Sequence, residues 1–254
     1  MSQVECQVED RVAVLTLSAP ERRNALTAEL ITDLLAALDN VEGRDDVGAL
    51  VVTGAPPAFC AGAALGDLGS TMDGAGKKEP GERLMGVYEA FLRVARSSLP
   101  TVAAVNGPAV GAGMNLALAC DVRVAGRSGR FDTRFLQLGL HPGGGHTWMA
   151  RRAMGAQATA ATVLFGERLD AERALAAGLV WQVVDDAELL AAATGLAAQA
   201  ANVDPALSRR TKDTLARTAG AATLEEAVEI ELDAQLWSMG RPEFAERIAA
   251  QRRR

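Results

Sequence analysis

Short, uncharged apolar runs that alternate with helical patterns constrain the fold of this 254-residue chain more than any other feature. Residues 48–54 and 101–105 are two such runs, each followed closely by a glycine, as expected of strands buried on both faces. Residues 27–41 precede the first run with apolar side chains at helical spacing, and Thr27 suits the cap of that helix. A second helix is predicted at 82–97. Strands and helices in alternation are typical of βα units, so the sequence predicts an α/β fold with a largely parallel sheet.

The charge balance excludes several classes of partner. The 26 Lys and Arg against 32 Asp and Glu give a net charge of −6, which disfavours nucleic acid or an anionic membrane surface as the main partner.

Residues 99–120 carry no charge and are long enough to span a bilayer, but Asn106-Gly107-Pro108 interrupts them, which favours a strand, a turn and a helix start.

The cysteines and the N-terminus indicate where the protein resides. Cys6, Cys60 and Cys120 form no CxxC pair and are odd in number, so neither a disulfide framework nor a cysteine-rich zinc site is predicted. The N-terminal residues lack the basic start and apolar stretch of a secretory signal. We therefore expect a cytoplasmic protein with reduced thiols.

Two loops of small residues carry the chemical argument. Residues 58–65 directly follow a predicted buried strand, and residues 106–116 follow the next one. In the second loop Gly111, Ala112 and Gly113 open a helix, so unpaired N–H groups and the positive end of the helix dipole would stabilise an oxyanion there. Either loop alone is better explained by a helix packing closely on a sheet, and neither is a phosphate-binding motif.

Together, the two loops resemble those of the crotonase superfamily, the enoyl-CoA hydratase and isomerase family. Residues 20–26 (PERRNAL) resemble its opening turn, residues 59–65 its first oxyanion loop and residues 100–121 its second. Residues 142–145 and 177–180 follow in the family's order, so the resemblance covers nearly the whole chain.

The resemblance implies a fold, an assembly and a ligand. It implies a core of repeated ββα units at 1–195 that holds a pocket for CoA and its acyl group. It further implies a helical region at 196–254 that joins subunits into a homotrimer or a hexamer. The ligand would be a small-molecule CoA thioester, as substrate in fatty acid or acyl-CoA metabolism, with no metal and no further cofactor.

Site residues follow from the same resemblance. The oxyanion donors would be the backbone N–H groups of Ala63 and Ala112, where only the amide matters. Residues proposed to contact CoA are Arg22, Ala25, Ala61, Ala63, Leu65, Gly111 and Lys212. The aspartate that commonly follows the first donor is replaced by Ala64.

The sequence departs from the family at both catalytic glutamates. Asn115 stands where the first is expected, and a gapless alignment places Phe135 at the second. An amide can orient water but cannot accept its proton. Each missing acid or base should cost roughly 10²–10⁴ in rate, so efficient hydration by the usual pair of glutamates is not expected.

Three hypotheses remain open. The first is a noncanonical enzyme, such as an isomerase, decarboxylase or related lyase, with Asp132, His141 or His146 as acid or base. The second is a non-catalytic acyl-CoA-binding or regulatory protein. The third is an enoyl-CoA hydratase whose acid and base residues have moved. Either histidine could equally tie its glycine-rich loop through hydrogen bonds, and no third ligand makes the pair a metal site.

Overall fold

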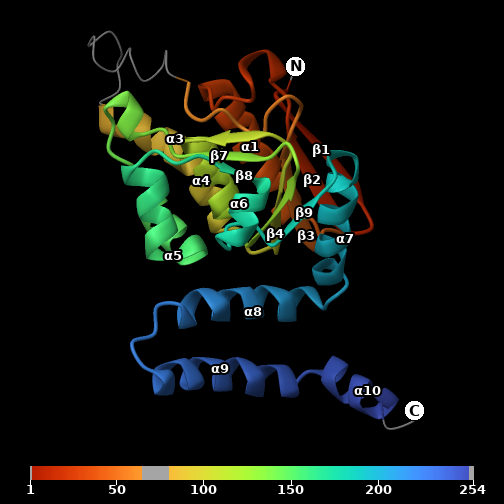
Figure 1. Cartoon of the computed structure of the whole chain (residues 1–254). Helices are drawn as coiled ribbons and strands as arrows, with labels where there is room; N and C mark the ends of the chain where they lie inside the picture. Colours follow the sequence, from red (N-terminus) through yellow and green to blue (C-terminus); the bar gives the residue numbers. More distant parts are fainter. Residues whose placement is uncertain (1, 65–79, 252–254) are drawn as a thin grey trace.

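The computed structural model describes residues 2–64 and 80–251, and a six-stranded sheet forms its centre (Figure 1). The strand order is β1 (Val4–Glu9), β2 (Val12–Leu17), β3 (Ala49–Gly54), β4 (Thr101–Val105), β6 (Val122–Gly126) and β9 (Gln182–Val184). Only β1 runs antiparallel to its neighbour, so the predicted α/β fold with a largely parallel sheet is confirmed.

Helices cover both faces of this sheet. Alternate strand residues such as Val51 and Val102 pack against α7 (Leu189–Ala201). The residues between them, such as Leu50 and Ala103, belong to the larger core with α1 (Ala28–Glu42), α3 (Pro80–Ala95) and α4 (Ala112–Ala119). Burial on both faces explains why these strands are apolar throughout.

A second sheet has three strands, and the first of them in the chain leads into α4. Its order is β5 (Pro108–Val110), β7 (Arg130–Asp132) and β8 (Leu169–Asp170). The remaining core helices are α5 (His146–Leu164) and α6 (Ala171–Ala176). The sequence analysis predicted neither β8 nor β9, which have only two and three residues.

Three C-terminal helices stand away from the core. Figure 1 shows α8 (Pro205–Thr218) below the core, α9 (Leu224–Met239) below α8, and α10 (Pro242–Gln251) at the end of the chain. An ion pair of 2.6 Å between Arg210 and Asp233 joins α8 to α9. The predicted division of the chain at residue 195 falls inside α7, which packs on the sheet, and α8 is the first helix beyond the core.

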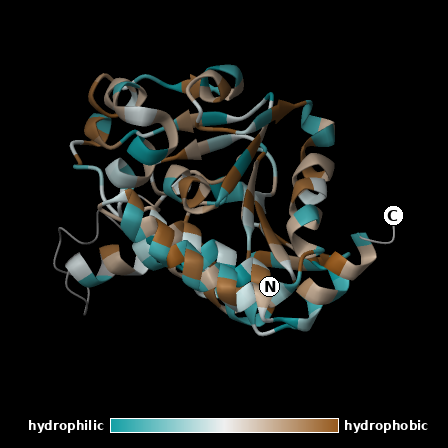
Figure 2. Cartoon of the chain, turned by 90° about the horizontal axis from the view of Figure 1, so that it is seen from below, coloured by the Kyte–Doolittle hydropathy of each residue, from teal (hydrophilic) through white to brown (hydrophobic). Residues whose placement is uncertain are grey.

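Helix α9 carries a stripe of exposed apolar side chains. Figure 2 views the chain from below and shows apolar residues among polar ones on the C-terminal helices. At least half of each side chain in this stripe is exposed: Leu224, Val228, Leu232, Leu236 and Met239. Within the described part of the chain, no helix combines the length and the hydropathy needed to cross a membrane.

Candidate functional site

The two predicted loops lie side by side because they pair as parallel strands. The Cys60 N–H donates to the Pro108 carbonyl at 3.1 Å, and the Val110 N–H donates to the Cys60 carbonyl at 3.0 Å. A Cβ on Gly113 would overlap the carbonyl oxygen of Cys60, so only glycine permits this approach. A Cβ built on Gly62, whose φ is +93°, would lie 3.4 Å from the Ala112 nitrogen.

Backbone N–H groups of Ala63 and Ala112 are unpaired within residues 2–64 and 80–251. Ala112 is the first residue of α4, and the first bond within that helix runs from the Asn115 N–H to the Gly111 carbonyl at 3.0 Å. On the other loop, the neighbouring N–H groups of Ala61 and Ala64 donate to backbone carbonyls, which leaves Ala63 between them. Two such donors on adjacent loops suit one oxyanion.

Both alanines line a cavity of about 210 Å³. Its apolar wall consists of Leu84, Val87, Val110, Phe135, Leu138 and Leu140. The lining that the structure describes includes no Asp or Glu. The cavity therefore combines two oxyanion donors with a surface suited to an apolar group.

Asn115 is held by its own hydrogen bonds at the wall of this cavity. Its Nδ2 donates to the Gly143 carbonyl at 3.1 Å, and its Oδ1 lies 2.6 Å from Nδ1 of His146. Because Oδ1 can only accept, His146 carries its proton on Nδ1. The Asn115 amide thus links α4 by hydrogen bonds to the start of α5 and to the glycine-rich loop. These bonds suit a positioning role for Asn115 better than a role in proton transfer.

His146 is a neutral base buried behind Asn115. Its side chain is 1% exposed, and burial lowers its pKa to about 4. Its Nε2 has no partner among the residues described, and its ring meets Phe135 edge-on at a centroid distance of 5.0 Å. His146 is not among the described residues that line the cavity, whereas Phe135 is.

Asp132 and His141 occupy different environments. The buried carboxylate of Asp132 pairs with Arg134 at 2.7 Å and Arg168 at 3.2 Å, and it does not line the described cavity. The exposed His141 does line it, with Nδ1 2.7 Å from the Pro142 carbonyl. Since that carbonyl can only accept, Nε2 of His141 remains free to accept a proton.

Among the predicted CoA contacts, the structure brings Ala61, Ala63 and Gly111 to the cavity. Arg22 ends a short 3-10 helix (Pro20–Arg22) and is exposed, and Ala25 follows in the same turn. Leu65 lies outside the described residues.

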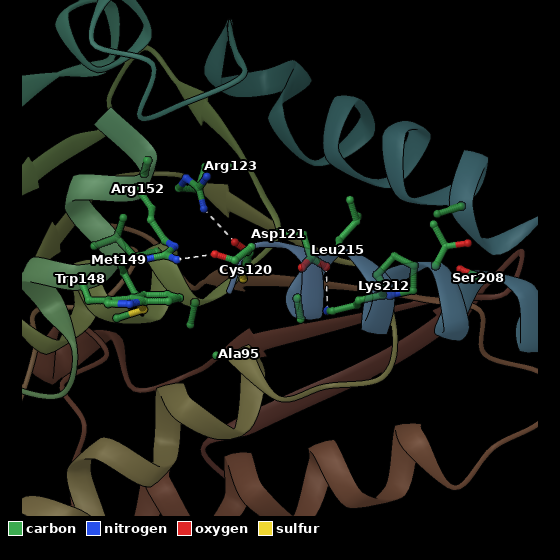
Figure 3. Close-up of a pocket in the computed structure, with 18 of the residues that line it drawn as sticks. Ala95, Cys120, Asp121, Arg123, Trp148, Met149, Arg152, Ser208, Lys212 and Leu215 are labelled. Carbon is green, nitrogen blue, oxygen red and sulfur yellow. Dashed lines mark hydrogen bonds and ion pairs between the residues drawn. The ribbon is translucent and has the colours of Figure 1, made fainter. Parts of the chain in front are cut away.

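Lys212 lines a different cavity. It lines a larger cavity of about 690 Å³ between the core and α8, shown in Figure 3. Its Nζ is held by Asp121 at 2.7 Å and by the Leu99 carbonyl at 2.6 Å. Lys212 therefore fastens α8 to the core in this chain.

Sequence reasoning missed two residues at the site. The buried Asn24 donates to the carbonyls of Ala55 and Ala58, each at 2.8 Å, and so ties the opening turn to the first loop. Tyr88 on α3 lines the cavity. The spacing of Leu84, Val87, Tyr88 and Phe91 on one helical face could have indicated Tyr88.

In the described ranges, no three His, Cys, Asp or Glu side chains gather into a possible metal site. Burial raises the pKa of Cys60 and Cys120 to about 12, so both thiols stay protonated and unreactive.

Comparison with known proteins extends the observations over the whole chain. A family model described as enoyl-CoA hydratase/isomerase matches residues 7–247. A Mycobacterium tuberculosis protein named probable enoyl-CoA hydratase is 48% identical over 253 residues, covering 97% of this chain and 96% of that protein. The 1,2-epoxyphenylacetyl-CoA isomerase of Escherichia coli is 35% identical over 244 residues, covering 96% and 92%.

A solved structure agrees with these matches. A probable enoyl-CoA hydratase/isomerase from Mycobacterium abscessus has a TM-score of 0.89 and 31% identity, covering 99% of this chain and 96% of that chain. The similarity thus includes the C-terminal helices as well as the core.

Proposed function

Because the chain belongs to the enoyl-CoA hydratase/isomerase family, we propose that it holds an acyl-CoA thioester with its carbonyl oxygen between the N–H groups of Ala63 and Ala112. The observation that carries the proposal is the pair of unpaired donors at one cavity. Negative charge grows on this oxygen when an enolate forms, and preorganised donors then stabilise it most.

The proposed reaction is an isomerisation, a decarboxylation or a related lyase step through such an enolate. Support comes from Asn115 and Phe135, which stand where the family's two glutamates are expected. The side-chain amide of Asn115 is also held by hydrogen bonds to His146 and Gly143. His141 is the exposed base at the cavity and is our first candidate for moving a proton.

An alternative is an enoyl-CoA hydratase with relocated acid and base residues. The relative from Mycobacterium tuberculosis, named a probable enoyl-CoA hydratase, favours it. A non-catalytic acyl-CoA-binding protein is the third possibility, and it is favoured by the absence of Asp and Glu from the described lining.

Acyl-CoA binding and turnover should be measured on one preparation. We expect saturated and 2-enoyl-CoA thioesters to bind, with hydration of 2-enoyl-CoA far below the roughly 1–10³ s⁻¹ usual for enzymes. Migration of the double bond in 3-enoyl-CoA and loss of CO₂ from malonyl-type thioesters would be tested in parallel. Hydration in the usual range, lost in His141→Gln, would establish the alternative, and failure to bind any acyl-CoA would reject the whole proposal.

A homotrimer, or a hexamer of two trimers, would bury the exposed stripe of α9. Leu232→Glu places a charge at the centre of that stripe and should shift the mass measured by light scattering toward the monomer. The matched control Glu226→Gln changes a charge on another face of the same helix and should keep the wild-type mass. A wild-type protein that is monomeric at all concentrations would contradict the proposed assembly.

A further inference from the structure

We infer that Tyr88 determines specificity by binding a second oxygen on the acyl group, so that the cavity favours oxygenated acyl-CoA thioesters over plain hydrocarbon ones. The inference rests on the proposed function, because it takes the thioester carbonyl to lie between Ala63 and Ala112.

The position of Tyr88 is fixed by close contacts. Its ring lies 5.8 Å from that of Phe91, and a Cβ on Gly143 would overlap its hydroxyl. A Cβ on Gly144 would likewise overlap the Phe91 ring. The two glycines thus let the loop lie directly against α3, which holds the phenol at the cavity wall.

Most other polar side chains in the described lining already have partners. Asn115 uses its amide on Gly143 and His146, and Thr133 donates to the Thr162 carbonyl at 2.9 Å. Arg134 pairs with Asp132, and His141 bonds the Pro142 carbonyl, although no residue that the structure describes hydrogen-bonds its Nε2.

Tyr88 differs from these, because its hydroxyl makes no hydrogen bond to any described residue. A phenol both donates and accepts, and a half-buried phenol beside Leu84 and Val87 gains from a polar partner.

The cavity is small, so its wall at Tyr88 lies close to the proposed carbonyl site. Its volume of about 210 Å³ is that of about seven water molecules at ~30 Å³ each, so a short acyl group fills it. Tyr88 also touches Gly143, whose carbonyl binds Asn115 in the first turn of α4. An acyl group anchored at Ala112 therefore passes within reach of the phenol, and a hydroxyl or carbonyl oxygen on its chain would complete the hydrogen bond.

Calorimetry with two ligands on Tyr88→Phe tests the inference. Butyryl-CoA and 3-hydroxybutyryl-CoA, in both enantiomers, differ only by the hydroxyl. Removal of one neutral hydrogen bond should weaken one enantiomer of 3-hydroxybutyryl-CoA about three- to tenfold and leave butyryl-CoA within about twofold. The phenyl ring keeps its packing on Phe91 and Gly144, so the variant is expected to fold.

Thr133→Val is the matched control, because it removes a lining hydroxyl that is already bonded within the protein. It should change both affinities by the same factor. Equal losses for both ligands in Tyr88→Phe, or none, would overturn the inference while acyl-CoA binding itself stands. A wild-type protein that binds neither ligand would overturn the inference together with the proposed function.

Discussion

Replacing Ala112 by proline should lower turnover of an acyl-CoA thioester by about 10²–10³, the usual effect of losing one oxyanion donor. Proline has no N–H, so the substitution deletes the donor without adding a polar group. Ala112 is the first residue of α4, where proline is well tolerated because its N–H has no partner within the helix. The loss should fall mainly on kcat, since charge on the oxygen is greatest in the transition state.

The matched control is Ala112→Gly, which keeps the N–H and should retain most activity. Ala63→Pro removes the other donor and should cause a loss of similar size, provided that its circular dichroism spectrum matches that of the wild type. Wild-type turnover in a folded Ala112→Pro protein would remove the basis of the oxyanion assignment.

Acid should destabilise the protein through His146. Its folded pKa of about 4 lies below the ordinary value of 6.5, so the unfolded chain binds a proton more readily between these values. The contribution of neutral His146 is therefore complete above pH 6.5 and is lost progressively as the pH falls toward 4. Linkage gives a decrease of about 2 kcal/mol in the free energy of unfolding between pH 7.5 and pH 5.

Urea unfolding of wild type and His146→Gln at both pH values measures this effect. Glutamine can still hydrogen-bond Asn115 but does not titrate. The free energy of unfolding of His146→Gln should therefore fall about 2 kcal/mol less on acidification than that of the wild type. His141→Gln removes the other histidine, which is exposed, and should keep the steep wild-type fall. Identical pH dependence in wild type and His146→Gln would contradict a buried neutral imidazole.

The core was predictable because its signals are local. Thr27 does cap α1, accepting from the Leu30 N–H at 3.2 Å, and β4 spans the predicted 101–105. Small residues at 58–65 and 106–116 also indicated two loops that approach each other, and a parallel bridge between Cys60 and Ala109 joins them.

What escaped prediction depends on contacts between distant residues. The bond between Asn115 and His146 joins positions 31 apart, and no local pattern indicates it. Lys212 reaches Asp121 across 91 residues, and it lines the larger cavity. Within the predicted helical region at 196–254 the sequence also did not indicate the break between α9, which ends at Met239, and α10, which begins at Pro242.

The start of α4 has a further consequence for ligand binding. Helices α1, α6, α8 and α9 each begin after a Thr or Asp whose side chain accepts a backbone N–H, whereas Gly111 before α4 offers no side chain. All eight residues of α4 are buried, and its start has no side-chain cap for the first N–H groups. A bound thioester would serve as that cap, and substrate would then become a structural part of the fold during each catalytic cycle.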